Sequence, residues 1–214
     1  TLDIDFNTGE PSPVDGFLEN PFQSSSFSYV ECKTEYGQSY LRNADEETIV
    51  GQEVWYLDEN DNTNVEFVRH ILFVDHEYFI MLDNINSDNN DNNIYSWRFH
   101  ANAGIDTEGV LIENNYGGII SNSENNLVNL LVYITTPDNN PVISYPTSIH
   151  SDDILGPSFY KEHKVIQADQ EAIDTQFLTL FYPYQSNDSI LVLNFDNSPD
   201  YIGLYLQRPS NYYD

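Results

Sequence analysis

The chain of 214 residues carries 7 Lys and Arg residues against 35 Asp and Glu residues, which gives a net charge of −28. A surface this acidic repels nucleic-acid phosphates and anionic lipid headgroups, so nucleic-acid binding and attachment to a bare anionic membrane are excluded. Because 40% of the residues are hydrophobic, including 16 Tyr and 12 Phe, the chain can bury a core, and global disorder is excluded.

The acidity has three open explanations, namely a surface adapted to high salt, calcium-binding loops, or the solubility of a secreted protein. Cys32 is the only cysteine, so no internal disulfide is expected. The sequence begins at Thr1 and contains no apolar run of signal-peptide or membrane-spanning character. We therefore expect a processed or excised chain that is extracellular or at the cell surface and is not inserted in a membrane.

The first 24 residues contain three prolines and two glycines without a sustained hydrophobic period. We expect residues 1–24 to form an extended lead-in segment and residues 25–214 to form one domain. From Phe27 onward, apolar and β-branched runs alternate with clusters of Asn, Asp, Gly and Pro, a pattern typical of strands and turns. The first four strands are expected to form an antiparallel meander, over residues 48–57, 65–74, 77–85 and 94–101.

The remaining pattern continues as short strands to the end of the chain. A single helical turn is expected around 169–173. More than ten short strands with almost no helix predict an all-β protein, an antiparallel two-sheet β-sandwich with little or no helix. The later strands are expected at 110–112, 118–120, 127–135, 141–145, 163–167, 175–182, 190–195 and 201–206.

No catalytic residue is predicted, because the sequence lacks the nucleophile-elbow, zinc-protease, Walker and dinucleotide-binding motifs. A pair of carboxylates for glycoside hydrolysis cannot be singled out among 35 acids. The chain alone is therefore not expected to be an enzyme.

Two sets of residues are candidate metal ligands. The first set, with oxygens at alternating positions as in calcium loops, is Asp58, Asn60, Asp61 and Asn62. The alternative is that this run is an ordinary polar hairpin tip. The second set is Asp83 and His100, at the ends of strands expected to be adjacent, where they could converge on a zinc-like metal. The alternative is that Asp83 caps a turn and His100 bonds to a sheet edge.

Four aromatic side chains are candidates for stacking on sugar rings, because the apolar face of a sugar packs well on Tyr and Trp. They are Trp55, Trp97, Tyr182 and Tyr184. The alternative for each is a place in the protein core, which is where large aromatic side chains contribute most.

Three stretches share an order and spacing with a known family. Residues 68–83 contain an expected strand led by Arg69, followed by Tyr78-Phe79 and Asp83. Residues 95–100 end as aromatic-x-x-His, and residues 175–184 are an expected strand that runs to a proline. Together they resemble the C-terminal β-sandwich of heparinase II/III-like polysaccharide lyases. The family usually has a His just before the leading Arg, where this chain has Phe67 and Val68.

The resemblance spans residues 27–195 and implies a β-sandwich beside a large helical catalytic domain. No stretch matches the catalytic or metal-binding motifs of that family. The leading hypothesis is a non-catalytic accessory domain that supports a carbohydrate groove, with a polysaccharide or an upstream catalytic domain as partner. The alternatives are a secreted structural protein, forming filaments by strand exchange of residues 1–24, and a calcium-dependent carbohydrate-binding or adhesion module.

Overall fold

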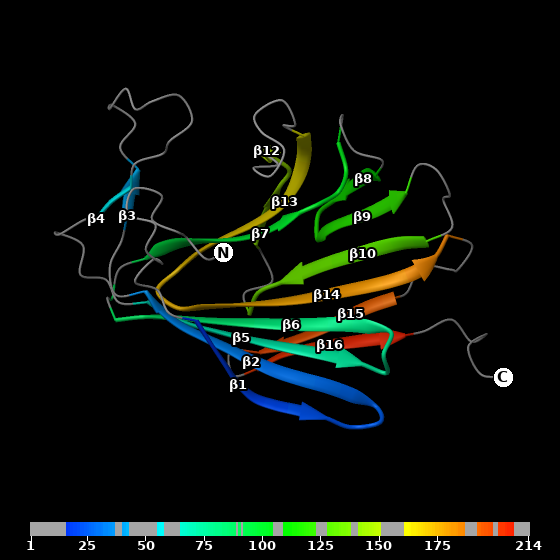
Figure 1. Ribbon diagram of the computed structural model, residues 1–214, viewed down its shortest axis with the longest axis horizontal. Coiled ribbons are helices and arrows are strands. Elements are labelled where there is room, and N and C mark those ends of the chain that lie inside the picture. Colours follow the sequence, from blue (N-terminus) through cyan, green and yellow to red (C-terminus); the bar gives the residue numbers. More distant parts are fainter. Residues whose placement is uncertain are drawn as a thin grey trace.

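The predicted all-β antiparallel sandwich is confirmed by the computed structural model (Figure 1). Among the described residues, none forms a helix with the length and apolarity needed to span a membrane. The structure describes residues 16–36, 40–42, 55–57, 65–88, 90, 92–104, 109–122, 128–137, 141–150, 161–186, 192–198 and 201–207.

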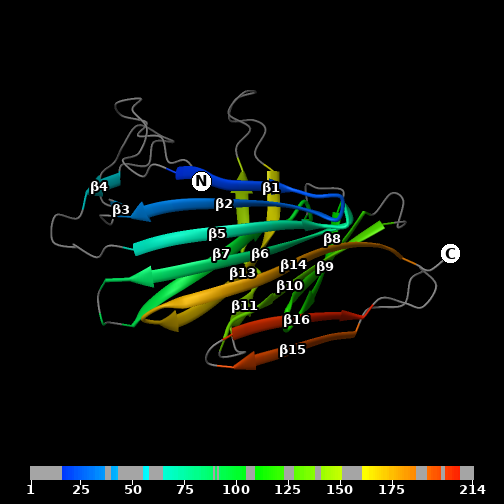
Figure 2. The same ribbon diagram turned by 90° about the horizontal axis from the view of Figure 1, so that it is seen from below.

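The larger sheet has eight antiparallel strands, which Figures 1 and 2 show side by side. In spatial order they are β1 (Gly16–Gln23), β2 (Phe27–Tyr36), β5 (Val65–Val74), β6 (Tyr78–Ser87), β14 (Thr175–Gln185), β10 (Val128–Thr135), β9 (Gly117–Asn122) and β8 (Gly109–Asn114). The sheet therefore joins strands from both ends of the chain, and β14 inserts between β6 and β10.

The second sheet is built around β13 (Lys161–Ala172). One edge of β13 pairs with β7 (Asn93–His100), and the other edge pairs with β11 (Val142–Ser144) and β12 (Thr147–His150). Figure 1 shows β7 and β13 lying over the face of the larger sheet. We call this face of the larger sheet the inward face and the opposite one the outward face.

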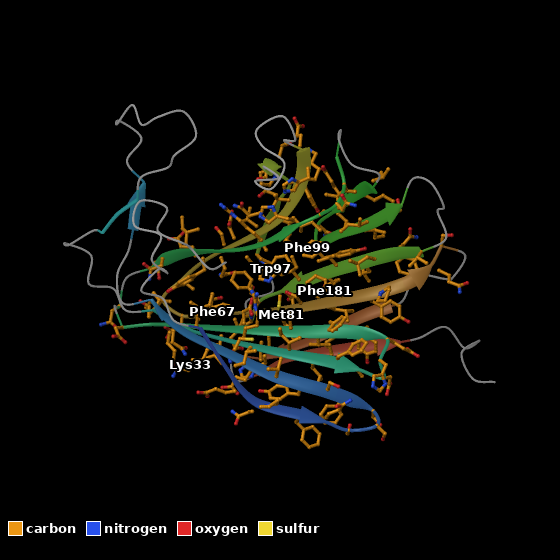
Figure 3. All side chains as sticks on the ribbon, in the orientation of Figure 1. Lys33, Phe67, Met81, Trp97, Phe99 and Phe181 are labelled. Carbon is orange, nitrogen blue, oxygen red and sulfur yellow. The ribbon has the colours of Figure 1, made fainter. Side chains whose placement is uncertain are left out.

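The core between the sheets contains side chains from β7, β10, β13 and β14. Its buried members are Trp97, Val132, Ile134, Ile166, Ala168 and Phe177. In Figure 3, Trp97 and Phe99 of β7 point toward Phe181 and Met81 of the larger sheet. This packing of two inner faces is the arrangement expected of a β-sandwich.

A hairpin covers part of the outward face. It consists of β15 (Val192–Ser198) and β16 (Tyr201–Gln207), and Figure 2 shows it beside β10 and β14. Leu204 of β16 packs against a second cluster, which has Leu131, Leu180 and Tyr182 among its buried members. The central strands β10 and β14 are therefore covered on both faces, which explains their continuous apolar sequence.

The predicted four-strand meander is wrong beyond its central hairpin. β5 and β6 pair as expected, but β6 next pairs with β14, and β7 crosses to pair with β13. The residues described from the expected strand 48–57 are β4 (Trp55–Leu57), which pairs with β3 (Tyr40–Arg42) and not with β5. Apolar side chains of β14 are buried on both faces of the larger sheet. This strand therefore takes the central position next to β6, which the meander would have given to β7.

The predicted helical turn around 169–173 is also wrong. Residues up to Ala172 continue β13, and Asp169 to Ala172 pair in register with Ser96 to Asn93 of β7. Pairing with a neighbouring strand satisfies these backbone groups, which overrides the weak local preference for a helical turn.

Residues 16–23 lie within the lead-in segment expected over 1–24, and they form the extended edge strand β1. The register of β1 shifts between Glu19 and Phe22, where Asn20 has a φ of 50° and Pro21 follows. A bulge and a proline at an edge hinder pairing with a further strand. The boundary between the lead-in segment and the domain stays a prediction.

Replacing Phe177 by alanine should destabilise the fold strongly, because its side chain is 1% exposed in the core between the sheets. The expected loss in the free energy of unfolding is about 3–5 kcal/mol. Urea unfolding followed by tryptophan fluorescence measures it. The matched control is Ile94→Ala on β7, at a side chain 72% exposed, where a change within about 0.5 kcal/mol is expected. Equal losses in both variants would contradict this placement of the core.

Candidate functional site

A hollow of about 210 Å³ opens at one end of the larger sheet and is the candidate functional site. Strands β9, β10 and β14 form its floor, and the connection between β7 and β8 forms its rim. Its lining residues are Asn102, Gly109, Ile120, Ser121, Val128, Asn129, Leu130 and Pro183.

The register of three strands builds the floor of the hollow. Leu130 of β10 pairs with Ile120 of β9 on one side and with Pro183 of β14 on the other. Ile120 and Leu130 also pack against the core between the sheets, so the floor lies on the inward face. Val128, two residues before Leu130, is 56% exposed and leaves an apolar side chain open to solvent at this end of the strand.

A close backbone approach shapes the rim. Ala103 and Gly109 form an isolated parallel bridge, which brings the end of the β7–β8 connection back beside its start. A Cβ atom on Gly109 would lie 1.9 Å from the carbonyl oxygen of Asn102. Any larger residue at position 109 would therefore displace Asn102 from the rim.

The lining of the hollow contains no charged side chain, although the chain carries a net charge of −28. Apolar side chains form the floor, and the neutral residue Asn102 lies at the rim. Asn129 and Ser121 pair across β10 and β9, and their side chains alternate to the outward face, so these side chains do not point into the hollow. An apolar surface with few polar groups and no charge suits a ligand that has an apolar face. A sugar ring has such a face.

Arg69 and Asp83 form an ion pair on the inward face, away from the hollow. Arg69 Nε donates to Asp83 Oδ1 at 2.7 Å, and Nη2 donates to Oδ2 at 2.8 Å. The Asp83 side chain is 2% exposed and that of Arg69 is 35% exposed. The Arg69 guanidinium also lies 5.2 Å from the centre of the Phe67 ring. The bidentate geometry fixes β5 against β6 and neutralises the buried carboxylate.

The structure places Asp83 and His100 in different sheets. Asp83 lies on β6 and binds Arg69, while His100 lies on β7 with its Nδ1 2.7 Å from Nε2 of the buried His163. In the described part of the chain, no three His, Cys, Asp or Glu side chains are grouped so as to hold a metal ion. Asp58, Asn60, Asp61 and Asn62 lie outside the described residues. Both metal predictions stay predictions.

The candidate sugar-stacking aromatics whose side chains the structure describes do not share one surface. Trp97 and Tyr182 are each 5% exposed, in the cores on the two faces of the larger sheet. Tyr184 is half-buried and shares a side-chain hydrogen bond with Asn129, its partner across β10 and β14. Trp55 belongs to β4, and its side chain lies outside the described residues. Their role in sugar binding stays a prediction.

A polar cluster on the outward face was not found by sequence reasoning. His70 Nδ1 lies 2.7 Å from the Tyr29 hydroxyl oxygen, and His70 Nε2 lies 3.0 Å from Asn84 Nδ2. The Tyr29 hydroxyl donates to Glu31 at 3.2 Å. Burial, reinforced by Glu31, raises the pKa of Tyr29. Because these side chains come from β2, β5 and β6, no local motif could have indicated them.

Solved structures resemble this chain, although no protein-family model and no curated protein matches it. A crystal structure of heparinase III matches 91% of this chain and 27% of its own length, with a TM-score of 0.58 and 12% identity. The heparan sulfate lyase HepC from Pedobacter heparinus matches 97% of this chain and 29% of its own length, with a TM-score of 0.60 and 9% identity. The chain has a heparinase-like fold.

A third structure, the heparinase III BT4657 gene product, matches 86% of this chain and 24% of its own length, at a TM-score of 0.57 and 10% identity. The chain therefore spans only about a quarter of the heparinase structures that it resembles. Identities this low establish the shared fold and assign no role to any single residue.

Removing one partner of the Arg69–Asp83 pair should cost more stability than removing both. Asp83→Leu leaves the guanidinium without its carboxylate, and the expected loss is about 2–3 kcal/mol, since Arg69 remains partly exposed. The double variant Arg69→Met with Asp83→Leu should lose less than Asp83→Leu alone. Urea unfolding of the parent protein, Arg69→Met, Asp83→Leu and the double variant measures the coupling. Additive losses would contradict a coupled pair.

Three partly buried phenols should make the fold sensitive to alkali. Burial raises the pKa of Tyr133, Tyr145 and Tyr184 above the ordinary value of 10.0. The folded protein then holds these protons more tightly than the unfolded chain. This contribution to stability is complete below the unfolded pKa and is lost as the pH rises through the folded pKa.

The variant Tyr133→Phe tests this linkage, because it removes one of the three phenols and keeps the ring. Its free energy of unfolding should fall less than that of the parent protein between about pH 8 and pH 11. Urea unfolding at the two pH values measures both proteins. An equal or steeper fall in the variant would show that Tyr133 does not contribute to the alkaline transition.

Proposed function

We propose that the chain is a non-catalytic accessory domain of a heparinase II/III-like polysaccharide lyase, equivalent to the C-terminal β-sandwich of that family, and that it supports a carbohydrate groove. The observation that carries this proposal is the unequal coverage of the structural matches. Nearly all of this chain, 86–98%, corresponds to only 24–29% of each heparinase chain. The heparinase-like fold thus accounts for one part of a larger enzyme, and a catalytic domain is the expected partner.

The hollow supports the carbohydrate part of the proposal. Its apolar floor and neutral rim fit a sugar ring, and its lining residues include no side chain that works as an acid or a base near neutral pH. Cleavage by β-elimination needs a base for the proton beside the carboxylate and an acid for the leaving oxygen. We therefore propose that the domain contacts the polysaccharide and leaves the chemistry to its partner.

The negative charge of the domain makes its contact with an anionic polysaccharide dependent on salt. A protein with a net charge of −28 repels a polysaccharide rich in uronates or sulfates. Salt weakens this repulsion, since the Debye length falls from about 10 Å at 0.1 M to about 3 Å at 1 M. Contacts with sugar in the uncharged hollow depend little on salt, so binding should strengthen as the salt concentration rises.

The alternative proposals include calcium binding by residues 58–62 and self-association of the chain. They also include an extracellular or cell-surface location. The filament alternative requires residues 16–23 to leave their place in the chain's own sheet, where β1 pairs with β2. The calcium-dependent adhesion alternative predicts glycan binding that a chelator abolishes. The accessory-domain proposal predicts glycan binding that a chelator leaves unchanged.

Affinity electrophoresis and a lyase assay on the purified chain test the proposal together. In gels containing heparan sulfate, retardation is expected at about 1 M salt and should be weaker at about 0.1 M salt. Incubation with the same polysaccharide should release no product with the ultraviolet absorbance of an unsaturated uronate. Such a product, formed by the purified chain alone, would overturn the non-catalytic role.

A matched pair of variants locates the binding site. Val128→Asp places a carboxylate at the hollow and should weaken retardation about tenfold, as expected for a central apolar contact. The control Val142→Asp makes the same change on β11, where Val142 is 67% exposed and does not line the hollow. Equal retardation of the two variants would show that the hollow does not bind the polysaccharide.

A further inference from the structure

The outward face of the larger sheet carries an apolar strip at the end where the β1–β2 and β5–β6 hairpins turn. Strand register places Phe27 of β2 opposite Val74 of β5, and Val74 opposite Tyr78 of β6. Tyr78 packs on the outward cluster, so this row lies on the outward face. Tyr29 and Leu72 form the next row on the same face. We call these side chains the outward strip and define it by Phe22, Phe27, Tyr29, Leu72, Val74 and Tyr78.

A bulge in β1 brings Phe22 to the outward strip. Phe22 comes three positions after Glu19 on β1, but their partners on β2, Tyr29 and Glu31, are only two positions apart. The extra residue reverses the alternation of side chains, so without it Phe22 would lie on the inward face. Asn20 lies in the bulge with a φ of 50°, a left-handed value that Asn tolerates. Bulges re-aim side chains in this way beside functional sites.

Phe22 and Phe27 are the most exposed members of the strip and lie next to each other. Phe22 is 54% exposed and Phe27 is 36% exposed, and their ring centres are 5.3 Å apart. Ser24 fixes the turn between them, because its hydroxyl oxygen accepts from the N–H of Phe27 at 3.0 Å. The N–H of Asp75 donates to the carbonyl oxygen of Ser26 at 2.6 Å and joins this turn to the β5–β6 turn. The fold therefore holds the two rings together without help from a ligand.

The β15–β16 hairpin, which covers the outward face elsewhere, lies away from the two phenylalanines. Leu204 of β16 packs on the outward cluster, as Tyr78 does at the inner end of the strip. Among the described residues, this cluster includes no side chain of β1 or β2. Figure 2 shows β15 and β16 near β14 and well apart from β1 and β2. Neighbouring aromatic side chains exposed on one sheet face indicate a binding surface.

The strip is uncharged, but carboxylates border it. Glu19 and Glu31 occupy the row beyond Tyr29 on the outward face. The Tyr29 hydroxyl donates to Glu31 at 3.2 Å and lies 2.7 Å from His70 Nδ1. Asn20 Nδ2 also donates to Glu31, at 3.4 Å. A ligand on the strip therefore meets aromatic rings beside groups that accept hydrogen bonds and carry negative charge.

Charge decides which ligand fits this surface. A second copy of the chain would bring another charge of −28, and the repulsion between the two copies opposes association. Glu19, together with Asp75 and Glu77 in the β5–β6 turn, is exposed and repels anionic polysaccharides and anionic lipid headgroups. An uncharged glycan meets no such repulsion, and its hydroxyl groups can donate hydrogen bonds to carboxylates.

We propose that the outward strip is a binding site for an uncharged glycan chain, separate from the hollow. The C–H faces of the sugar rings pack on Phe22 and Phe27, and sugar hydroxyl groups donate to Glu31. The exposed face of an extended sheet suits a long chain better than a single sugar. The inference does not rest on the proposed function, because the strip lies on the outward face and the floor of the hollow lies on the inward face.

Affinity electrophoresis of the purified chain tests the site with three uncharged polysaccharides, namely hydroxyethyl cellulose, galactomannan and laminarin. At least one of them should retard the chain, equally at about 0.1 M and about 1 M salt. Phe22→Ala and Phe27→Ala should each weaken this retardation about tenfold, since each removes a ring at the centre of the contact. The matched control is Phe79→Ala, at a side chain 43% exposed on the inward face of β6, and it should be retarded like the parent protein.

Two further variants separate ring stacking from space filling. Phe27→Leu keeps an apolar side chain without a ring and should lose retardation as Phe27→Ala does, whereas Phe27→Trp should keep it. Retardation of Phe27→Leu equal to that of the parent protein would overturn the stacking role. Circular dichroism and thermal unfolding establish that the variants are folded. If the Phe27 variants fail to fold, Phe22→Ala on the exposed edge strand still decides the question.

The other outcomes separate this site from the alternatives. If none of the three polysaccharides retards the chain, the site is wrong. Loss of retardation in Val128→Asp, with retention in Phe22→Ala, would assign the glycan to the hollow and overturn the strip. Binding to phosphatidylcholine vesicles that Phe22→Ala abolishes, without retardation by a polysaccharide, would overturn it in favour of a membrane contact. Retardation by heparan sulfate should be unchanged in Phe22→Ala, so the proposed function and this site can fail independently.

Discussion

The structure depends on the burial of β10 and β14 on both faces. Val132 and Phe177 pack beneath the second sheet, while Leu131 and Leu180 pack in the outward cluster with Leu204 of β16. An antiparallel sheet can leave one face in water, but strands this apolar cannot do so without a large loss of hydrophobic stabilisation. Cover on both faces therefore fixes the position of the second sheet and of the β15–β16 hairpin.

The same constraint limits the core between the sheets to part of the larger sheet. Among the described residues, that core includes side chains of β6, β8, β9, β10 and β14 and none of β1, β2 or β5. At one end of the central strands, Asn102 and Gly109 approach each other closely and line the hollow. The position of the hollow therefore follows from pairings between strands that lie far apart in the sequence.

Charge acts over longer distances than packing contacts do. The −28 charge opposes association between copies of the chain and disfavours polyanions at low salt, yet the lining of the hollow contains no charged side chain. Repulsion between like charges is long-ranged, whereas apolar contact is short-ranged, so salt weakens the first and leaves the second nearly unchanged. The Arg69–Asp83 pair neutralises the buried carboxylate on the inward face of the sheet.

By itself, the sequence determined the all-β class and the positions of most strands, because the alternation of side chains between two faces is a local property. It also determined the acidity that limits possible partners. Strand order was decided by tertiary structure, since burial on both faces drew β14 between β6 and β10 and sent β7 to the second sheet. Tertiary structure likewise decided the hollow and the separation of Asp83 from His100, which depend on pairings between residues far apart in the chain.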